Sequence, residues 1–211
     1  VMSSGNGVRI YGTHDAGISW EEQYVDDNEE VFFDGLAFWN QYEGLAYGDP
    51  IGGRMALLST NTGWKWNPGG ENLPETLPGE AGYAASGTGI VVHENNVWIA
   101  TGGGEVSRVF HSSDSGSTWH AHKTPLATGE GCGIFSLAFA DKDHGVAVGG
   151  CYLDSLNSFG NSAWSDDGGV SWYAPETAPA GYRSCASFTK NKRYGVTVGR
   201  TGCEWTADLG H

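Results

Sequence analysis

Short apolar segments, separated by polar turns rich in glycine, recur along the whole 211-residue chain. Each unit contains an apolar segment, a polar turn, a second apolar segment that ends in glycine, and a third segment that leads into a turn closed by tryptophan. Such runs between turn residues are typical of β-strands, and no stretch keeps the 3.6-residue apolar period of a helix. The predicted first strands are Phe33–Trp39, Gly82–Gly87, Gly133–Phe139 and Tyr182–Phe188, and the predicted second strands are Gly44–Gly48, Val97–Gly102, Gly145–Gly149 and Gly195–Gly199.

The turns closed by tryptophan share the pattern Ser/Thr-x-Asp-x-Gly-x-Ser/Thr-Trp, which is the Asp box, or BNR repeat. Full copies occur at 13–20, 112–119 and 165–172, a degenerate copy at 59–66 has asparagine in the aspartate position, and a fifth begins at Thr206. The aspartate can accept N–H groups of its own turn, the glycine supplies a positive φ, and the tryptophan starts the next strand. We therefore predict a structural role for the residues in this position, Asp15, Asn61, Asp114, Asp167 and Asp208.

Units of roughly 40 to 50 residues with four strands are typical of propeller blades. We expect an all-β protein in which residues 1–211 form one β-propeller domain of four-stranded antiparallel blades, three complete and two partial. A solenoid or a β-sandwich is the alternative architecture. The first unit lacks its first strand and the last stops inside its box, so we expect a propeller that is incomplete at both ends.

The chain also resembles a known group, the sialidase-like Asp-box propellers labelled photosystem II stability/assembly factor-like or "oxidoreductase". The resemblance implies a seven-bladed ring, of which this chain would supply the middle and later blades. No Gly-x-Gly-x-x-Gly motif supports the oxidoreductase label, so we expect no cofactor. The segments that carry the resemblance are Arg9–Tyr11, Phe32–Trp39, Gly48–Pro50, Gly53–Arg54, Gly79–Ala81, Ala85–Thr88, Trp98–Gly103, Arg108–Phe110, Gly133–Ser136 and Gly181–Ser184.

Composition narrows the set of partners. The net charge of −14 repels phosphate backbones, so a nucleic-acid partner is not expected. No apolar run approaches the roughly 20 residues of a membrane-spanning helix. His120 and His122 alternate on one predicted strand and could suit a metal, but no third ligand is evident, so we expect a surface pair and no metal site.

Four cysteines stand at spacings that lack the CxxC signature of zinc or redox sites. Their even number in an acidic chain with few lysines predicts disulfides and a secreted location or another oxidising lumen. Antiparallel neighbours can come within disulfide distance, so we predict the pairs Cys132–Cys151 and Cys185–Cys203. Free thiols are the alternative.

Three sets of side chains could carry chemistry. Arg9, Arg54 and Arg108 recur shortly before their turns and could form an anion-binding set with Arg183, although each could instead pair with a nearby acid. Aromatic residues, Tyr182 and Trp39 among them, could stack on sugar rings or simply pack between blades. The weak catalytic candidates are the carboxylates Asp34, Asp49 and Glu80, which fall near strand ends.

No coherent catalytic set emerges from these residues. A sialidase usually has an Arg-Ile-Pro start, whereas Arg9-Ile10 is followed here by Tyr11. We therefore expect a non-catalytic propeller scaffold that binds a protein partner or a glycan on one face. The alternative is a secreted glycoside hydrolase or polysaccharide lyase of Asp-box architecture, which would need two carboxylates facing each other across a cleft.

Overall fold

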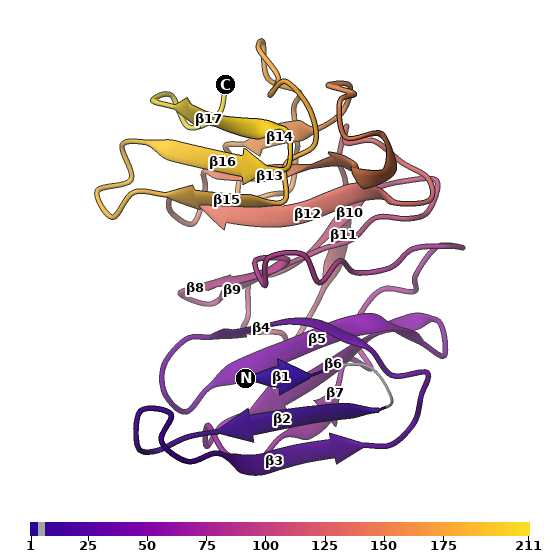
Figure 1. The fold of residues 1–211 in the computed structure, drawn as a ribbon, viewed down its shortest axis with the longest axis vertical. Helices are drawn as coiled ribbons and strands as arrows, with labels where there is room; N and C mark the ends of the chain where they lie inside the picture. Colours follow the sequence, from indigo (N-terminus) through magenta and orange to yellow (C-terminus); the bar gives the residue numbers. More distant parts are fainter. Residues whose placement is uncertain (4–6) are drawn as a thin grey trace.

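The computed structural model describes residues 1–3 and 7–211 and shows an all-β chain. Its strands form five antiparallel sheets that follow one another in chain order, from the indigo sheet to the yellow sheet in Figure 1. We number these sheets blades 1 to 5. Within the described residues, the regular helical structure is the 3₁₀ turn η1 (Tyr152–Asp154), and no helix is long and apolar enough to cross a membrane.

Blades 1 and 2 contain the first seven strands. Blade 1 has the order β1-β2-β3 and blade 2 the order β4-β5-β6-β7, so each strand pairs with its neighbour in sequence. The strands are β1 (Met2–Ser3), β2 (Val8–Gly12), β3 (Glu21–Asp26), β4 (Phe33–Phe38), β5 (Gly44–Ile51), β6 (Arg54–Thr60) and β7 (Asn67–Gly69).

Blades 3 to 5 contain the remaining ten strands with the same up-and-down order. In blade 4 a fourth strand is reduced to one bridge between Trp164 and Tyr173. The strands are β8 (Ile90–His93), β9 (Asn96–Ala100), β10 (Arg108–Ser112) and β11 (His120–Lys123) in blade 3, β12 (Cys132–Phe139), β13 (Gly145–Cys151) and β14 (Ser162–Ser165) in blade 4, and β15 (Cys185–Phe188), β16 (Gly195–Gly199) and β17 (Gly202–Thr206) in blade 5.

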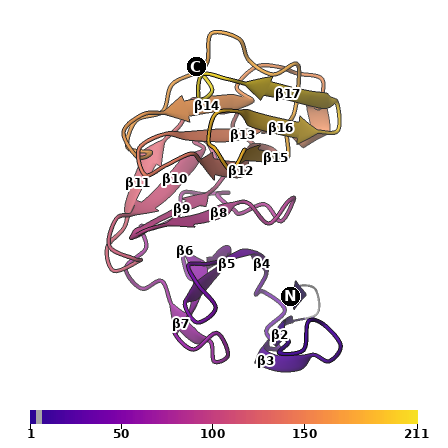
Figure 2. The ribbon, with the colours of Figure 1, turned by 90° about the vertical axis from the view of Figure 1, so that its left-hand side faces the viewer.

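The first strands of successive blades pack against one another. Strand β4 contacts β8, β8 contacts β12, and β12 contacts β15, so these strands form the inner edge of the stack. The view in Figure 2 shows the same succession of sheets from the side. Two of the five sheets have four strands and three have three, and antiparallel sheets of this kind arranged around a shared inner edge are the blades of a β-propeller.

One predicted first strand is wrong. The segment 82–87 is not a strand: Ala81 makes a single bridge to Gly102, and Gly87 has a φ of +70°. The inner strand of blade 3 is instead β8, whose Ile90 pairs with Ile99 of β9. Positive φ at Gly87 takes the backbone out of the extended conformation, so pairing resumes only in the apolar run from Ile90.

The tryptophans of three of the repeated turns fill the junctions with the preceding blades. Trp66 packs among residues of β2 and β5, Trp119 among residues of β5 and β9, and Trp172 among residues of β9 and β13. All three are less than a tenth exposed. Burying a side chain of this size stabilises the fold by about 2–3 kcal/mol or more, so these indoles join the blades.

The carboxylate of each complete turn is used by the turn itself. Asp15 Oδ1 accepts the Ser19 N–H at 2.8 Å and Asp15 Oδ2 accepts the Ser19 hydroxyl at 2.6 Å. These hydrogen bonds lower the pKa of Asp15 to about 2. Asp114 and Asp167 accept the equivalent N–H groups, both at 2.8 Å. In all three complete turns, the aspartate thus accepts an N–H group four residues further along the same turn.

The two incomplete copies differ from this pattern. In the degenerate turn the hydroxyl of Thr62, and not the side chain of Asn61, accepts the N–H groups of Trp64 and Lys65, at 3.2 and 3.0 Å. In the last copy Asp208 accepts the hydroxyl of Thr206, and the Asp208 N–H donates back to that hydroxyl at 3.2 Å.

The cysteines form one disulfide and not two. Cys132 on β12 lies directly opposite Cys151 on β13, and the two are joined as predicted. The predicted pair Cys185–Cys203 is wrong, because both thiols are free. Cys185 faces Val198 on β16, and Val198 in turn faces Cys203 on β17, so the two cysteines are two strands apart. That separation of roughly 9–10 Å exceeds the reach of a disulfide.

Candidate ligand-binding face

Two of the predicted carboxylates meet where β4 begins and β5 ends. Phe33 pairs with Gly48 and Gly35 pairs with Tyr47, so Asp34 is the extra residue of a β-bulge. Gly48 and Pro50 have successive partners on β6, so Asp49 is the extra residue of a second bulge. Bulges turn side chains out of the regular alternation of a strand. We call the side of the propeller at which the first strands begin the entry face.

The surroundings of Asp34 are those of a neutral carboxylic acid. Asp34 is only 5% exposed, and its Oδ2 has no hydrogen-bond partner among the described residues. Burial, reinforced by the negative charge of Asp49, raises the pKa of Asp34 to about 8. Burial also raises the pKa of Asp49, against a hydrogen bond from the Gly82 N–H. Asp34 therefore keeps its proton at pH 7.

A segment of blade 3 covers this carboxylate pair. The Gly82 N–H, in the segment before β8, donates to Asp49 Oδ1 at 3.0 Å. A Cβ atom at Gly82 would lie 2.2 Å from Asp34 Oδ2. Glycine is therefore required for the backbone to lie this close to the acids.

Four aromatic residues extend the entry face across blades 3 to 5. Tyr83 stacks on Phe135 with ring centroids 3.9 Å apart, and Phe135 meets Tyr182 edge-on at 4.8 Å and Tyr152 at 6.2 Å. Phe135 is the extra residue of a bulge in β12, the position that Asp34 occupies in β4. We call these four residues the aromatic cluster; it includes the predicted ligand-binding residue Tyr182.

The cluster continues into an exposed apolar loop. Tyr152, in η1, is 45% exposed, and the residues that follow it are more exposed still: Leu153 at 68%, Leu156 at 79% and Phe159 at 81%. We call residues 152–160 the η1 loop. Exposed apolar side chains gathered in one loop, beside a cluster of tyrosines, are typical of a surface that contacts a partner.

The four predicted anion-binding arginines do not come together. Each of them pairs with its own carboxylate, and two of these pairs are largely buried. A guanidinium that is already held by a carboxylate gives little to an added anion. The pairs are Arg9–Asp27, Arg54–Glu75, Arg108–Glu80 and Arg183–Glu204.

Glu80 and Trp39 are used within the packing of the blades. Glu80 Oε1 accepts the Arg108 Nε–H at 2.9 Å and the Thr101 hydroxyl at 2.6 Å, so this carboxylate is fully used within blade 3. Trp39 follows the other end of β4 and packs against the apolar cluster shared by blades 2 and 3. Neither residue therefore forms a catalytic set with Asp34 and Asp49.

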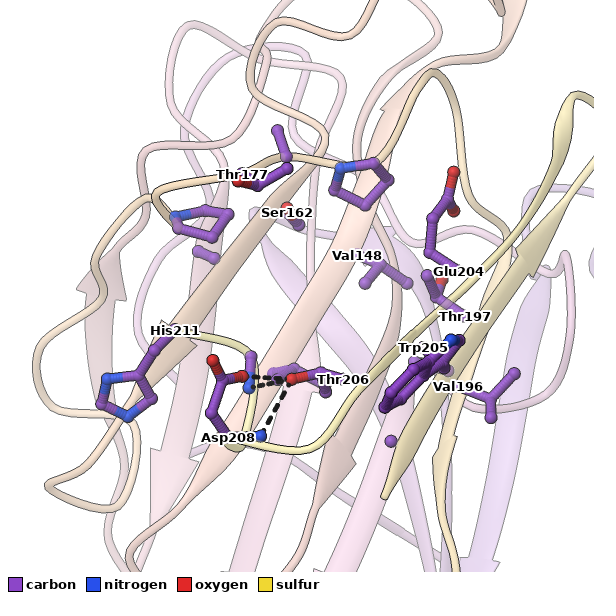
Figure 3. A pocket seen from close by; sticks show the side chains of 18 of the residues that line it. Val148, Ser162, Thr177, Val196, Thr197, Glu204, Trp205, Thr206, Asp208 and His211 are labelled. Carbon is purple, nitrogen blue, oxygen red and sulfur yellow. Dashed lines mark hydrogen bonds between the residues drawn. The ribbon is translucent and has the colours of Figure 1, made fainter. Parts of the chain in front are cut away.

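A cavity of about 470 Å³ lies between blades 4 and 5 (Figure 3). Its walls include Val148 of β13, Ser162 of β14 and Val196 of β16, with Trp205 and His211 at its rim. Two of the acids that line the cavity are already used within the chain: Glu204 pairs with Arg183, and Asp208 accepts the hydroxyl of Thr206. We therefore do not assign a reactive site to this cavity.

The two histidines of β11 are the remaining candidates for a metal site. His120 and His122 have ring centroids 6.4 Å apart. No group of three or more His, Cys, Asp or Glu side chains among the described residues is placed to hold a metal ion.

Comparisons with known proteins place this fold among the β-propellers. No protein-family model matches the chain, and no curated protein sequence matches it significantly. Its structure is similar to that of YCF48 bound to a D1 peptide, with 19% identity and a TM-score of 0.58, over 98% of this chain and 59% of that one.

Two glycoside hydrolases are also similar. For the GH74 enzyme of Niastella koreensis the identity is 15% and the TM-score 0.70, over 100% of this chain and 36% of the enzyme. For the α-L-arabinanase of Penicillium chrysogenum the values are 13% and 0.51, over 98% and 71%. The chain thus spans 59% of the first of these three relatives and 36% of the second. At such identities the likeness establishes the fold alone.

Proposed function

We propose that this chain is a non-catalytic β-propeller module that binds a protein or glycan ligand on its entry face. The observation that carries the proposal is the convergence of side chains from four successive blades. Blade 2 supplies Asp49, the segment before β8 supplies Tyr83, and blades 4 and 5 add the rest of the aromatic cluster. Tyrosine is enriched in binding surfaces because one end of the ring is apolar and the other is polar.

The placement of the carboxylates argues against hydrolysis. Glycosidases need two carboxylates that both reach the scissile bond. Asp34 is only 5% exposed, and the Glu80 side chain is 0% exposed and paired with Arg108. Asp49 is the partly accessible member of the set. One accessible carboxylate suits binding better than acid–base catalysis.

The comparisons support a binding role without defining the ligand. One similar structure is titled as bound to a peptide, and two others are named as glycoside hydrolases, so related propellers engage both kinds of ligand. We further propose that the repeated turns are Asp boxes of the BNR type, because their carboxylates are consumed within the turn. The Cys132–Cys151 disulfide supports a secreted location or another oxidising compartment.

The experiment compares ligand capture by the wild-type chain and by Tyr152→Ala, using a glycan array and a peptide array. Tyr152 is exposed, so its removal should leave the fold intact. We expect at least one ligand whose binding weakens about tenfold in Tyr152→Ala. The matched control is Tyr42→Ala, which removes another exposed tyrosine, from the turn between β4 and β5. Ligands that bind both variants equally well would overturn the entry-face proposal.

Glycoside hydrolysis is the second candidate, and one observation favours it. A carboxyl with a raised pKa beside a second carboxylate is the arrangement of a general acid and its partner. If this pair is catalytic, the chain hydrolyses a member of a glycan panel that includes arabinan, and Asp49→Asn lowers the rate by a factor of at least 10². Hydrolysis with that loss would displace the binding proposal.

A further inference from the structure

This inference rests on the proposed binding function and concerns the ligand of the entry face. Asp49 is the starting point. One of its oxygens accepts the Gly82 N–H, and Asp49 remains partly accessible at the edge of blade 2. Beside it lies Asp34, a buried carboxyl whose Oδ2 has no hydrogen-bond partner among the described residues. The backbone of Gly82 covers that oxygen, so Asp49 is the acid of the pair that a ligand can reach.

Three tyrosines lie beside the same point. The backbone continues from Gly82 directly to Tyr83, whose ring stacks on Phe135, which also contacts Tyr152 and Tyr182. The Tyr83 hydroxyl donates to the Cys132 carbonyl at 3.0 Å, so its oxygen is free to accept a hydrogen bond. Burial, with smaller contributions from Tyr152, Asp49 and Tyr182, raises the pKa of Tyr83 to about 12. The result is a group of oxygen atoms, one carboxylate and several phenols, that can accept hydrogen bonds from a donor with several N–H groups.

The arginines of blades 3 and 5 do not neutralise this group, because each is already paired with a carboxylate. Arg108, in blade 3, is held by Glu80, and Arg183, next to Tyr182, is held by Glu204 with an Nε–Oε2 distance of 2.5 Å. The chain as a whole carries a net charge of −14. The entry face therefore keeps a negative potential that attracts a cationic ligand.

The geometry points to an arginine side chain of a protein partner as the occupant, with its guanidinium on Asp49 and the tyrosine oxygens and its apolar neighbours on the η1 loop. Arginine offers five N–H donors in a planar fork and also stacks on aromatic rings. The exposed Leu153, Leu156 and Phe159 provide contact area for a polypeptide beside the charged group. A neutral glycan fits less well, because it gains nothing from the negative potential of the face and because two rings of the cluster, Phe135 and Tyr182, are only 4% and 7% exposed.

The test uses short labelled peptides and measures their affinity by fluorescence anisotropy. The probe is an acetylated, amidated pentapeptide with arginine at its centre and leucine or phenylalanine on both sides. The comparison peptide carries citrulline, which has the shape of arginine without its charge. We expect the arginine peptide to bind at least tenfold more tightly than the citrulline peptide. Equal affinities would overturn the inference.

The variants test the location of binding. Asp49→Asn should weaken the arginine peptide at least tenfold and leave the citrulline peptide unchanged. Glu21→Gln removes one negative charge from exposed β3 and is the matched control, which should bind like the wild type. If Asp49→Asn does not fold, Tyr152→Ala against Tyr42→Ala gives the same comparison with two exposed side chains.

The remaining outcomes separate this inference from the proposed function. Loss of binding in Glu21→Gln equal to that in Asp49→Asn would mean attraction by overall charge, and would overturn the assigned site. Glycan binding that depends on Tyr152, with no arginine preference, would overturn the inference and leave the proposed function standing. No binding of any peptide or glycan would overturn both.

Discussion

At the scale of single residues, Asp34 combines features that rarely occur together. It is the extra residue of a bulge, it is buried, and its Oδ2 has no partner among the described residues. In a regular strand, the Asp34 side chain would follow the alternation of side chains between the two faces of the sheet. The chain keeps an acid at a place where it must stay protonated, at a cost in stability that a packed apolar residue would not carry. Such a cost is typical of positions retained for function.

The protonation of Asp34 makes stability depend on pH. Its pKa of about 8 in the folded chain lies above the ordinary value of 3.8, so the folded state holds more protons between these limits. The free energy of unfolding therefore falls as the pH rises through about 4 to 8. We expect Asp34→Asn to flatten this dependence and to stabilise the chain at pH 9 by at least about 1 kcal/mol relative to the wild type.

Urea unfolding at pH 5 and pH 9 measures the effect. Glu21→Gln is the control, because this exposed side chain should leave the slope between the two pH values unchanged. Asp49, whose pKa is also raised by burial, contributes with the same sign. A wild-type chain that is as stable at pH 9 as at pH 5 would contradict the buried, protonated state of Asp34.

At the scale of strands, the pairing register decides which cysteines can form a disulfide. Cys132 and Cys151 lie opposite each other on adjacent strands, whereas Cys185 and Cys203 are separated by β16. In sequence the two pairs look alike, because each has one cysteine near a first strand and one beyond the following glycine. The difference is that Cys151 ends β13, while the tight turn after Gly199 carries the chain into β17 before Cys203.

Alkylation of the unreduced, unfolded chain should therefore label two cysteines, Cys185 and Cys203, and reduction should release the other two. Mass spectrometry counts the labels. Reduction should lower the free energy of unfolding by about 3 kcal/mol, as expected for a closed loop of this size. Cys203→Ser is the control and should change stability by less than about 0.5 kcal/mol, because the residue is exposed. Four labels without reductant would show that the disulfide is absent.

The entry face was only partly predictable at this scale. The sequence pattern places Asp34 and Asp49 near strand ends, but it does not show the two bulges that bring them together. The pattern predicts a strand at Tyr83 that does not form, and Phe135 stands inside a continuous apolar run that gives it no distinguishing signal. One signal was available: Phe135 stands in β12 where Asp34 stands in β4, so an alignment of the repeats would have linked them.

At the scale of the whole molecule, the repeated turns determine the architecture. Their aspartates, glycines and tryptophans have local roles that hold in any environment, so the propeller could be predicted from them. The ligand-binding surface could not, because it depends on contacts between blades that differ in every copy. The arginines illustrate the limit: they repeat in sequence, yet each is paired with an acid of its own surroundings.

The junction tryptophans give a prediction at this scale. Trp119→Ala should destabilise the chain by about 3–5 kcal/mol, because it empties the space between blades 2 and 3. Trp20→Ala, in the equivalent position of the first turn, should cost about 1 kcal/mol, because Trp20 is 45% exposed. Thermal unfolding of both variants measures the difference. Equal losses would show that the indoles are not what joins the blades.

Placing Trp66, Trp119 and Trp172 against the preceding blade gives the molecule a direction. Each of these repeats brings the side chain that attaches it to the blade made before it, so a chain leaving the ribosome can consolidate sheet by sheet. Cooperativity then passes between nearest neighbours, as in linear repeat arrays. Duplication of one such repeat in the gene would add a sheet together with the tryptophan that attaches it to the preceding sheet. This architecture can therefore grow by whole repeats.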